Sequence, residues 1–118
     1  MNKQIIIGNL TRDPETGTTP QGIHYTRFTV AARKRYHKDG APDATFFRVT
    51  AWRALGETCA RYLAKGRKVA VTGEVDVSAY LGSDGHAYAT LEITADEVEF
   101  LSPKGESDAE DERDQDPE

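Results

Sequence analysis

Residues 45–80 read TFFRVTAWRALGETCARYLAKGRKVAVTGEVDVSAY, and this stretch decides the fold. In its first part, 45–53, the apolar residues Phe47, Val49 and Ala51 occupy every second position, which predicts a strand. Residues 55–65 carry apolar side chains three and four positions apart, which predicts a short amphipathic helix that stops at Gly66. Residues 68–80 have valines at every second position and predict another strand. The apolar stripe of the predicted helix consists of Leu55, Cys59, Tyr62 and Leu63.

Three further strands are predicted outside this stretch. They cover residues 2–10, 22–35 and 86–101, and a Ser-Asp-Gly turn at 83–85 joins the last one to the strand before it. The apolar side chains of the last strand change parity near Ala95-Asp96, which predicts a β-bulge there. Residues 11–17 contain Asp-Pro and are expected to form a loop.

The order of these elements is three strands, one helix and a two-stranded hairpin. A short helix between strands three and four of five is the layout of an OB-fold. The sequence therefore predicts an all-β protein, a five-stranded OB-fold Greek-key barrel with one short α-helix between strands 3 and 4.

The charge is distributed unevenly along the 118 residues. Residues 1–104 hold 14 Lys and Arg against 12 Asp and Glu, a net charge of +2, whereas residues 105–118 hold one Arg and eight acids, a net charge of −7. The two parts together give the net charge of −5. We expect one folded domain at 1–104 and a disordered acidic tail at 105–118, because the tail has no aromatic or β-branched side chains and cannot bury enough apolar surface to fold.

Composition also narrows the class of protein. No apolar run approaches the roughly 20 residues of a membrane helix, and no signal peptide is apparent, so we expect a soluble cytoplasmic protein. The single cysteine, Cys59, excludes an internal disulfide and a cysteine-cluster metal site. The three histidines lack metal-ligand spacing, and no phosphate loop or nucleophile motif is present. We therefore expect neither an enzyme nor a cofactor.

The strand at 45–53 carries the most informative side chains. Its two faces differ because successive side chains point to opposite sides. The core face holds Phe47, Val49 and Ala51. The other face holds Phe46, Arg48 and Trp52. Two large aromatic rings around an arginine suit stacking of nucleobases with a phosphate contact, and the alternative is a second hydrophobic layer or a subunit contact.

Two tyrosines extend this pattern. Tyr80 has the parity opposite to the valines of its strand, and Tyr36 directly follows the cluster Arg33-Lys34-Arg35. Either tyrosine alone could be an ordinary surface residue. Aromatic rings interleaved with cations are typical of a groove for single-stranded nucleic acid. The predicted stacking residues are Tyr36, Phe46, Trp52 and Tyr80. The predicted phosphate-contacting residues are Arg33, Arg35, Arg48 and Lys3.

Several of these segments resemble the bacterial single-stranded DNA-binding protein family. The segments are MNKQIIIGNLTRDPE at 1–15, FFRVTAWRALGE at 46–57, ARYLAKG at 60–66, VAVTGE at 69–74, and Asp84-Gly85 followed by YATLEI at 88–93. The resemblance covers residues 1–103. It implies base stacking by the same four aromatic residues, a homotetramer, and roles in protecting unwound DNA during replication, recombination and repair.

The resemblance weakens at the end of the chain. Typical members finish in an acidic peptide with a terminal Pro-Phe anchor for replication and recombination proteins, whereas this chain ends Gln115-Asp116-Pro117-Glu118. We expect that the acidic residues compete with DNA for the groove at low salt. Two other functions remain open at this point: an OB-fold replication or restart accessory factor that acts mainly through protein partners, and an RNA-binding barrel of the cold-shock type.

Overall fold

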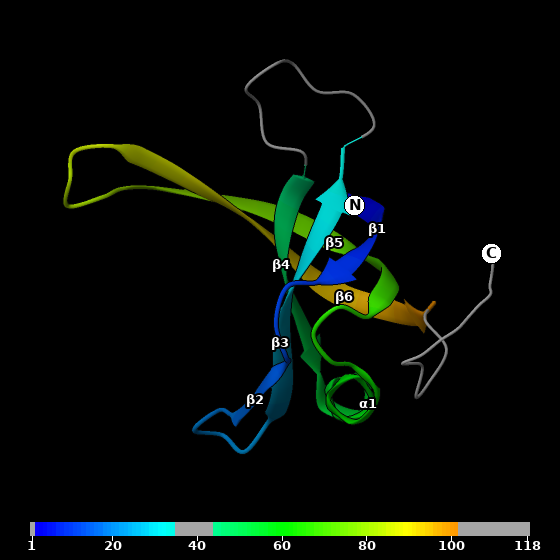
Figure 1. The fold of residues 1–118 in the computed structure, drawn as a ribbon. Helices are drawn as coiled ribbons and strands as arrows, with labels where there is room; N and C mark the ends of the chain where they lie inside the picture. Colours follow the sequence, from blue (N-terminus) through cyan, green and yellow to red (C-terminus); the bar gives the residue numbers. More distant parts are fainter. Residues whose placement is uncertain (1, 35–43, 102–118) are drawn as a thin grey trace.

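The computed structural model describes residues 2–34 and 44–101 (Figure 1). Its elements, in chain order, are β1 (Lys3–Leu10), β2 (Glu15–Thr18), β3 (His24–Arg33), β4 (Ala44–Trp52), α1 (Arg53–Tyr62), β5 (Lys68–Leu81) and β6 (Ala87–Phe100). Three of the sequence predictions, for Arg35, Tyr36 and the acidic tail, lie outside the described residues.

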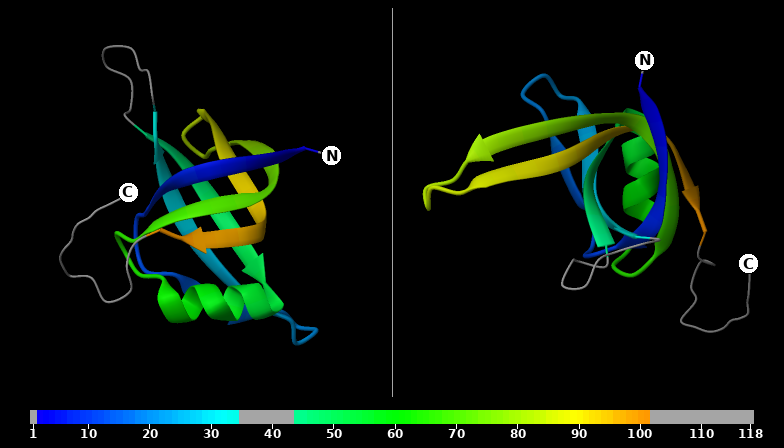
Figure 2. Two further views of the ribbon diagram at one scale, coloured as in Figure 1. Left: turned by 90° about the vertical axis from the view of Figure 1, so that its right-hand side faces the viewer. Right: turned by 90° about the horizontal axis from the view of Figure 1, so that it is seen from above.

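One strongly curved sheet forms the barrel. The strand order is β1-β5-β6-β4-β3-β2, and β1 also pairs with β3, which brings the two ends of the sheet together (Figure 2). The contact between β4 and β6 is parallel, and the others are antiparallel. This arrangement confirms the predicted OB-fold class, with α1 between the third and fourth predicted strands.

The described strands number six, so the prediction of five is corrected. The additional strand is β2, which falls within the predicted loop at 11–17 and just beyond it. Its four residues pair with β3, from Glu15 opposite Arg27 to Thr18 opposite His24. A stretch of four mostly polar residues shows no alternation, so its strand conformation comes from the partner strand and not from its own side chains.

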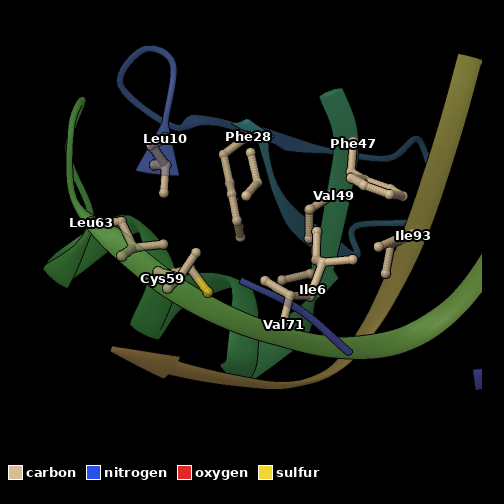
Figure 3. Close-up of a cluster of buried hydrophobic side chains, with 12 residues drawn as sticks. Ile6, Leu10, Phe28, Phe47, Val49, Cys59, Leu63, Val71 and Ile93 are labelled. Atoms are coloured by element: carbon tan, nitrogen blue, oxygen red, sulfur yellow. The ribbon is translucent and has the colours of Figure 1, made fainter. Parts of the chain in front are cut away.

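The core is built from the inward faces of the strands and one side of α1 (Figure 3). Phe47, Val49 and Ala51 are buried as predicted. The helix closes the end of the barrel with Cys59, and the buried Leu63 follows directly after the helix. The buried Thr26 hydroxyl on β3 donates a hydrogen bond to the Gly56 carbonyl at 2.7 Å. Gly56 permits this close approach, because a Cβ there would lie 2.5 Å from the Ala51 carbonyl oxygen.

The helix is displaced by a few residues from its predicted position. It starts at Arg53, directly after β4, and ends at Tyr62. The predicted stop, Gly66, lies beyond the helix in the turn to β5, where its N–H donates to the Leu10 carbonyl. The start is sharp because Arg53 takes a left-handed conformation with φ of 60°.

The last two strands extend well past the barrel as a hairpin (Figures 1 and 2). We call residues 77–91 the arm. The predicted bulge is confirmed: Thr72 pairs with Glu97 and Gly73 with Ala95, so Asp96 is left without a partner. On the arm, Val77 shares the parity of the buried valines and yet is 66% exposed.

Candidate nucleic-acid interface

The outward face of β4 carries the predicted aromatic residues. Phe46 is 54% exposed and Trp52 is 37% exposed, and the exposed Arg48 lies between them on the same face. The alternate residues Phe47, Val49 and Ala51 point into the core. The outward orientation predicted from strand parity is therefore present for all three side chains.

The neighbouring strand, β3, adds two residues that the sequence reasoning did not select. Tyr25 is paired with Trp52, and their rings meet edge to face with centroids 5.6 Å apart. The guanidinium carbon of Arg27 lies 4.7 Å from the centre of the Tyr25 ring. Arg27, Tyr25 and Trp52 thus form a continuous row of one cation and two rings on the outward face of β3 and β4.

A sequence signal for these residues did exist. Tyr25 and Arg27 have the same parity as the predicted Arg33, which is exposed at the end of β3 and pairs with Ala44. Parity alone places them on the outward face. What the sequence does not show is that β3 pairs with β4 in the register that sets Tyr25 beside Trp52.

A hollow of about 510 Å³ lies on this face, between β3, β4, β6 and the segment before β2. Three arginines line it, namely Arg12, Arg27 and Arg48. Three threonines line it as well, namely Thr11, Thr29 and Thr50. Its size is that of a typical small-ligand site, and its side chains can donate hydrogen bonds to phosphate oxygens.

The charge of the hollow is mixed. Asp13, Glu15 and Glu92 also line it, and Glu92 is the register partner of Arg48 across the parallel β4–β6 pair. The three carboxylates balance the three arginines in number. The hollow is therefore not a purely cationic channel, and a polyanion would have to be held by local arginine contacts together with stacking.

Lys3 lies at the start of β1. Its register partner there is Glu74 of β5. Its ammonium lies 2.8 Å from the Asp96 carboxylate, and this hydrogen bond raises the pKa of Lys3. The structure thus pairs Lys3 with a carboxylate on β6.

Tyr80 lies on the arm and is 56% exposed. Strand register relates Tyr80 to the outward face of β4. Arg48 of β4 pairs with Glu92 of β6, and Glu92 pairs with Asp76 of β5. Tyr80 is four residues after Asp76 and lies on the same side of β5. The Tyr80 ring stacks on the ring of Tyr88, its register partner on β6. The predicted aromatic residues that the structure describes therefore lie in two places, Phe46 and Trp52 on the barrel and Tyr80 on the arm.

Other kinds of site are not apparent within residues 2–34 and 44–101. No group of three or more His, Cys, Asp or Glu side chains there could hold a metal ion. None of the helices in that part of the chain is long and apolar enough to cross a membrane.

Comparison with known proteins agrees with this geometry. A single-stranded DNA-binding protein of Clostridium tetani is 38% identical over 102 residues, covering 86% of this chain and 70% of that protein. One from Caldanaerobacter subterraneus subsp. tengcongensis is 40% identical over 105 residues, covering 88% and 70%. The crystal structure of a small single-stranded DNA-binding protein from Streptomyces coelicolor superposes with a TM-score of 0.71 at 25% identity, covering 84% of this chain and 93% of that one.

A sequence model of the single-strand binding protein family matches residues 1–101, which include every described strand, the helix and the aromatic face. The match spans most of the chain and agrees with the relatives and with the fold. This chain belongs to the single-strand binding protein family.

Proposed function

We propose that this protein binds single-stranded DNA without sequence preference, by stacking bases on exposed aromatic rings and by contacting phosphates with arginines. The observation that carries the proposal is the outward row on β3 and β4, where Tyr25, Trp52 and Phe46 are flanked by Arg27 and Arg48. Nucleobases have π-faces whatever their identity, so such a row accepts any sequence. Membership of the family supports the same ligand.

In this mechanism the aromatic rings bind the bases and the arginines bind the phosphates. A ring that is half exposed on a rigid strand keeps one face free, and a base gains about 1–3 kcal/mol when it stacks there. The arginines of the hollow, Arg12, Arg27 and Arg48, add phosphate contacts that release counterions and make binding depend on salt. Single strands are favoured over duplexes because bases paired inside a duplex do not present their faces to the rings.

The test is a titration of Trp52 fluorescence with oligo-dT, duplex DNA and RNA. We expect strong quenching by oligo-dT and little by the duplex. Phe46→Leu should weaken the binding of oligo-dT at least about fivefold, because one stacking platform is lost. The matched control is Phe100→Leu, since Phe100 is also an exposed phenylalanine but packs beside Tyr62 of α1.

Three outcomes of this titration would contradict the proposal. Affinity for oligo-dT that does not change in Phe46→Leu and in Arg48→Ala would exclude the aromatic face as the binding site. The absence of binding by the parent protein would favour the accessory-factor alternative, in which the OB-fold acts mainly through protein partners. Stronger binding of RNA than of oligo-dT would favour an RNA-binding barrel.

We also propose that the protein forms a homotetramer in which β1 is part of a subunit contact. Residues 3–8 of β1 pair with β5 on one side only, within the described part of the chain. Ile5 is 69% exposed on this edge, and Ile7 is exposed on the same face. An apolar edge strand with free N–H and C=O groups is a template for pairing with a second chain.

The cellular roles follow from the ligand. A protein that covers single strands would act in replication, recombination and repair, where such strands arise, and in the cytoplasm with the nucleoid. We propose replication and recombination proteins as further partners. The acidic residues at 105–118, outside the described residues, would compete with DNA for the arginines at low salt.

A further inference from the structure

The tip of the arm contains a set of contacts that the proposed DNA-binding function does not by itself explain. Tyr80 and Tyr88 face each other across β5 and β6, with ring centroids 5.5 Å apart and ring planes inclined by 23°. The Tyr88 hydroxyl donates a short hydrogen bond to one oxygen of the Asp84 carboxylate. The other oxygen of Asp84 accepts the His86 backbone N–H at 3.0 Å.

The turn itself is shaped around the Tyr88 ring. A Cβ at Gly82 would lie 2.6 Å from Cε2 of Tyr88 and 2.9 Å from Oδ1 of Asp84, so only glycine allows the ring to lie this close to the turn. Gly85, with φ of +85°, closes the turn through its N–H to the Gly82 carbonyl. Tyr88 is therefore in contact with the turn, with Asp84 and with Tyr80.

The hydrogen bond is a charge-assisted one at neutral pH. It lowers the pKa of Asp84 and raises the pKa of Tyr88, so the carboxylate stays ionised and the phenol stays protonated. The side chain of His86 stands beside the same carboxylate, with Nδ1 3.4 Å from Oδ2. On an exposed hairpin, this arrangement immobilises a ring that would otherwise sample several rotamers.

We propose that Asp84 and Tyr88 are positioning residues that hold the Tyr80 ring in one orientation for stacking with a nucleobase. The inference rests on the proposed function and deepens it. Tyr88 stacks against Tyr80 and leaves that ring 56% exposed, with area free for a base. Because the ring is ordered before DNA arrives, binding does not have to order it, which strengthens affinity by about two- to tenfold for each side chain held in advance.

The test is a set of oligo-dT titrations with arm variants. Tyr88→Phe keeps the ring and removes the hydrogen bond, and Asp84→Ala removes the acceptor. We expect each to weaken binding about two- to fivefold, and the double variant to be no weaker than the single ones, because both break the same contact. Asp84→Asn keeps an acceptor and should restore part of the affinity. Tyr80→Leu should cause the largest loss.

The decisive comparison repeats Tyr88→Phe in the Tyr80→Leu background. We expect no further loss there, because Tyr88 acts through Tyr80. An equal loss in both backgrounds would overturn the inference, since Tyr88 would then contact DNA directly or support the arm in general. The thermal midpoints of all variants are compared with that of the parent, so that a folding defect is recognised.

Failure of this inference can be distinguished from failure of the proposed function. If Tyr80→Leu, Tyr88→Phe and Asp84→Ala all bind oligo-dT like the parent while Phe46→Leu does not, the arm has no stacking role and the barrel face alone binds DNA. If the parent itself does not bind oligo-dT, both proposals fail.

Discussion

The barrel half and the arm half of β5 and β6 are made from the same two strands, antiparallel throughout, and yet they differ in what they bury. Within the barrel, Val69 and Val71 are fully buried. Beyond it, Val77 and Leu81 continue the same parity and are largely exposed. The difference teaches that parity decides the side on which a residue stands, whereas burial requires another layer of the molecule on that side.

The largest expected effect compares two valines of one strand. Val71→Ala should lower the free energy of unfolding by about 2–3 kcal/mol, because it removes buried methyl groups and leaves a cavity. Val77→Ala should lower it by less than about 0.5 kcal/mol, because the side chain is exposed in both states. Urea unfolding measures both values. Equal losses would mean that the apolar side of the arm is covered in solution.

A smaller effect concerns the buried thiol in the barrel. Burial raises the pKa of Cys59 from its ordinary value of 9.0 to about 11. Between pH 9 and about 11 the folded protein therefore keeps the thiol proton that the unfolded chain loses. The contribution of the buried neutral thiol to the free energy of unfolding is complete below pH 9 and is lost progressively as the pH rises toward 11. At pH 10 the loss is about 1 kcal/mol. We expect the stability difference between the parent and Cys59→Ala to shrink by that amount between pH 8 and 10, as measured by urea unfolding.

The arm supplies the matched control for this thiol. Ala79→Cys in the Cys59→Ala background places a thiol on the exposed arm. It should react with a thiol reagent at once at pH 8, whereas Cys59 should react only as the protein unfolds. A Cys59 that reacts as fast as the arm cysteine would show that the end of the barrel under α1 opens readily.

The smallest effect on the fold should come from charges placed on exposed apolar positions. Ile5→Lys on the β1 edge should leave the protomer folded and reduce the mass measured by sedimentation, because it puts like charges into the proposed subunit contact. Leu81→Lys on the arm is the control and should leave the mass unchanged. The reverse result would place the subunit contact on the arm and not on β1.

Much of the aromatic face could be predicted because strand parity is a local property. Phe46, Arg48 and Trp52 stand on one face of β4 whatever the rest of the fold does. The parity change near Ala95-Asp96 is local in the same sense, and it marked the bulge correctly. The parity of β3 would also have selected Tyr25 and Arg27 if it had been followed along the whole strand.

The remaining features depend on partners that are distant in the sequence. β2 is a strand because β3 lies beside it. Glu92 is close to Arg48 because β4 and β6 pair in parallel, although α1 and β5 separate these two strands in the sequence. Lys3 on β1 forms an ion pair with Asp96 on β6, which is 93 positions later in the chain. Such contacts follow from the order of strands in the sheet, which local alternation does not contain.

The sequence by itself determined the class of fold, the outward direction of the barrel aromatics and the family to which the chain belongs, because each depends on neighbours within a few residues or on whole motifs. Only the tertiary structure decided which rings and cations meet, where the carboxylates stand among them, and how far β5 and β6 project beyond the core. The physical reason is that register, sheet closure and the covering of a face come from contacts between segments far apart in the chain, and no single segment specifies its partner.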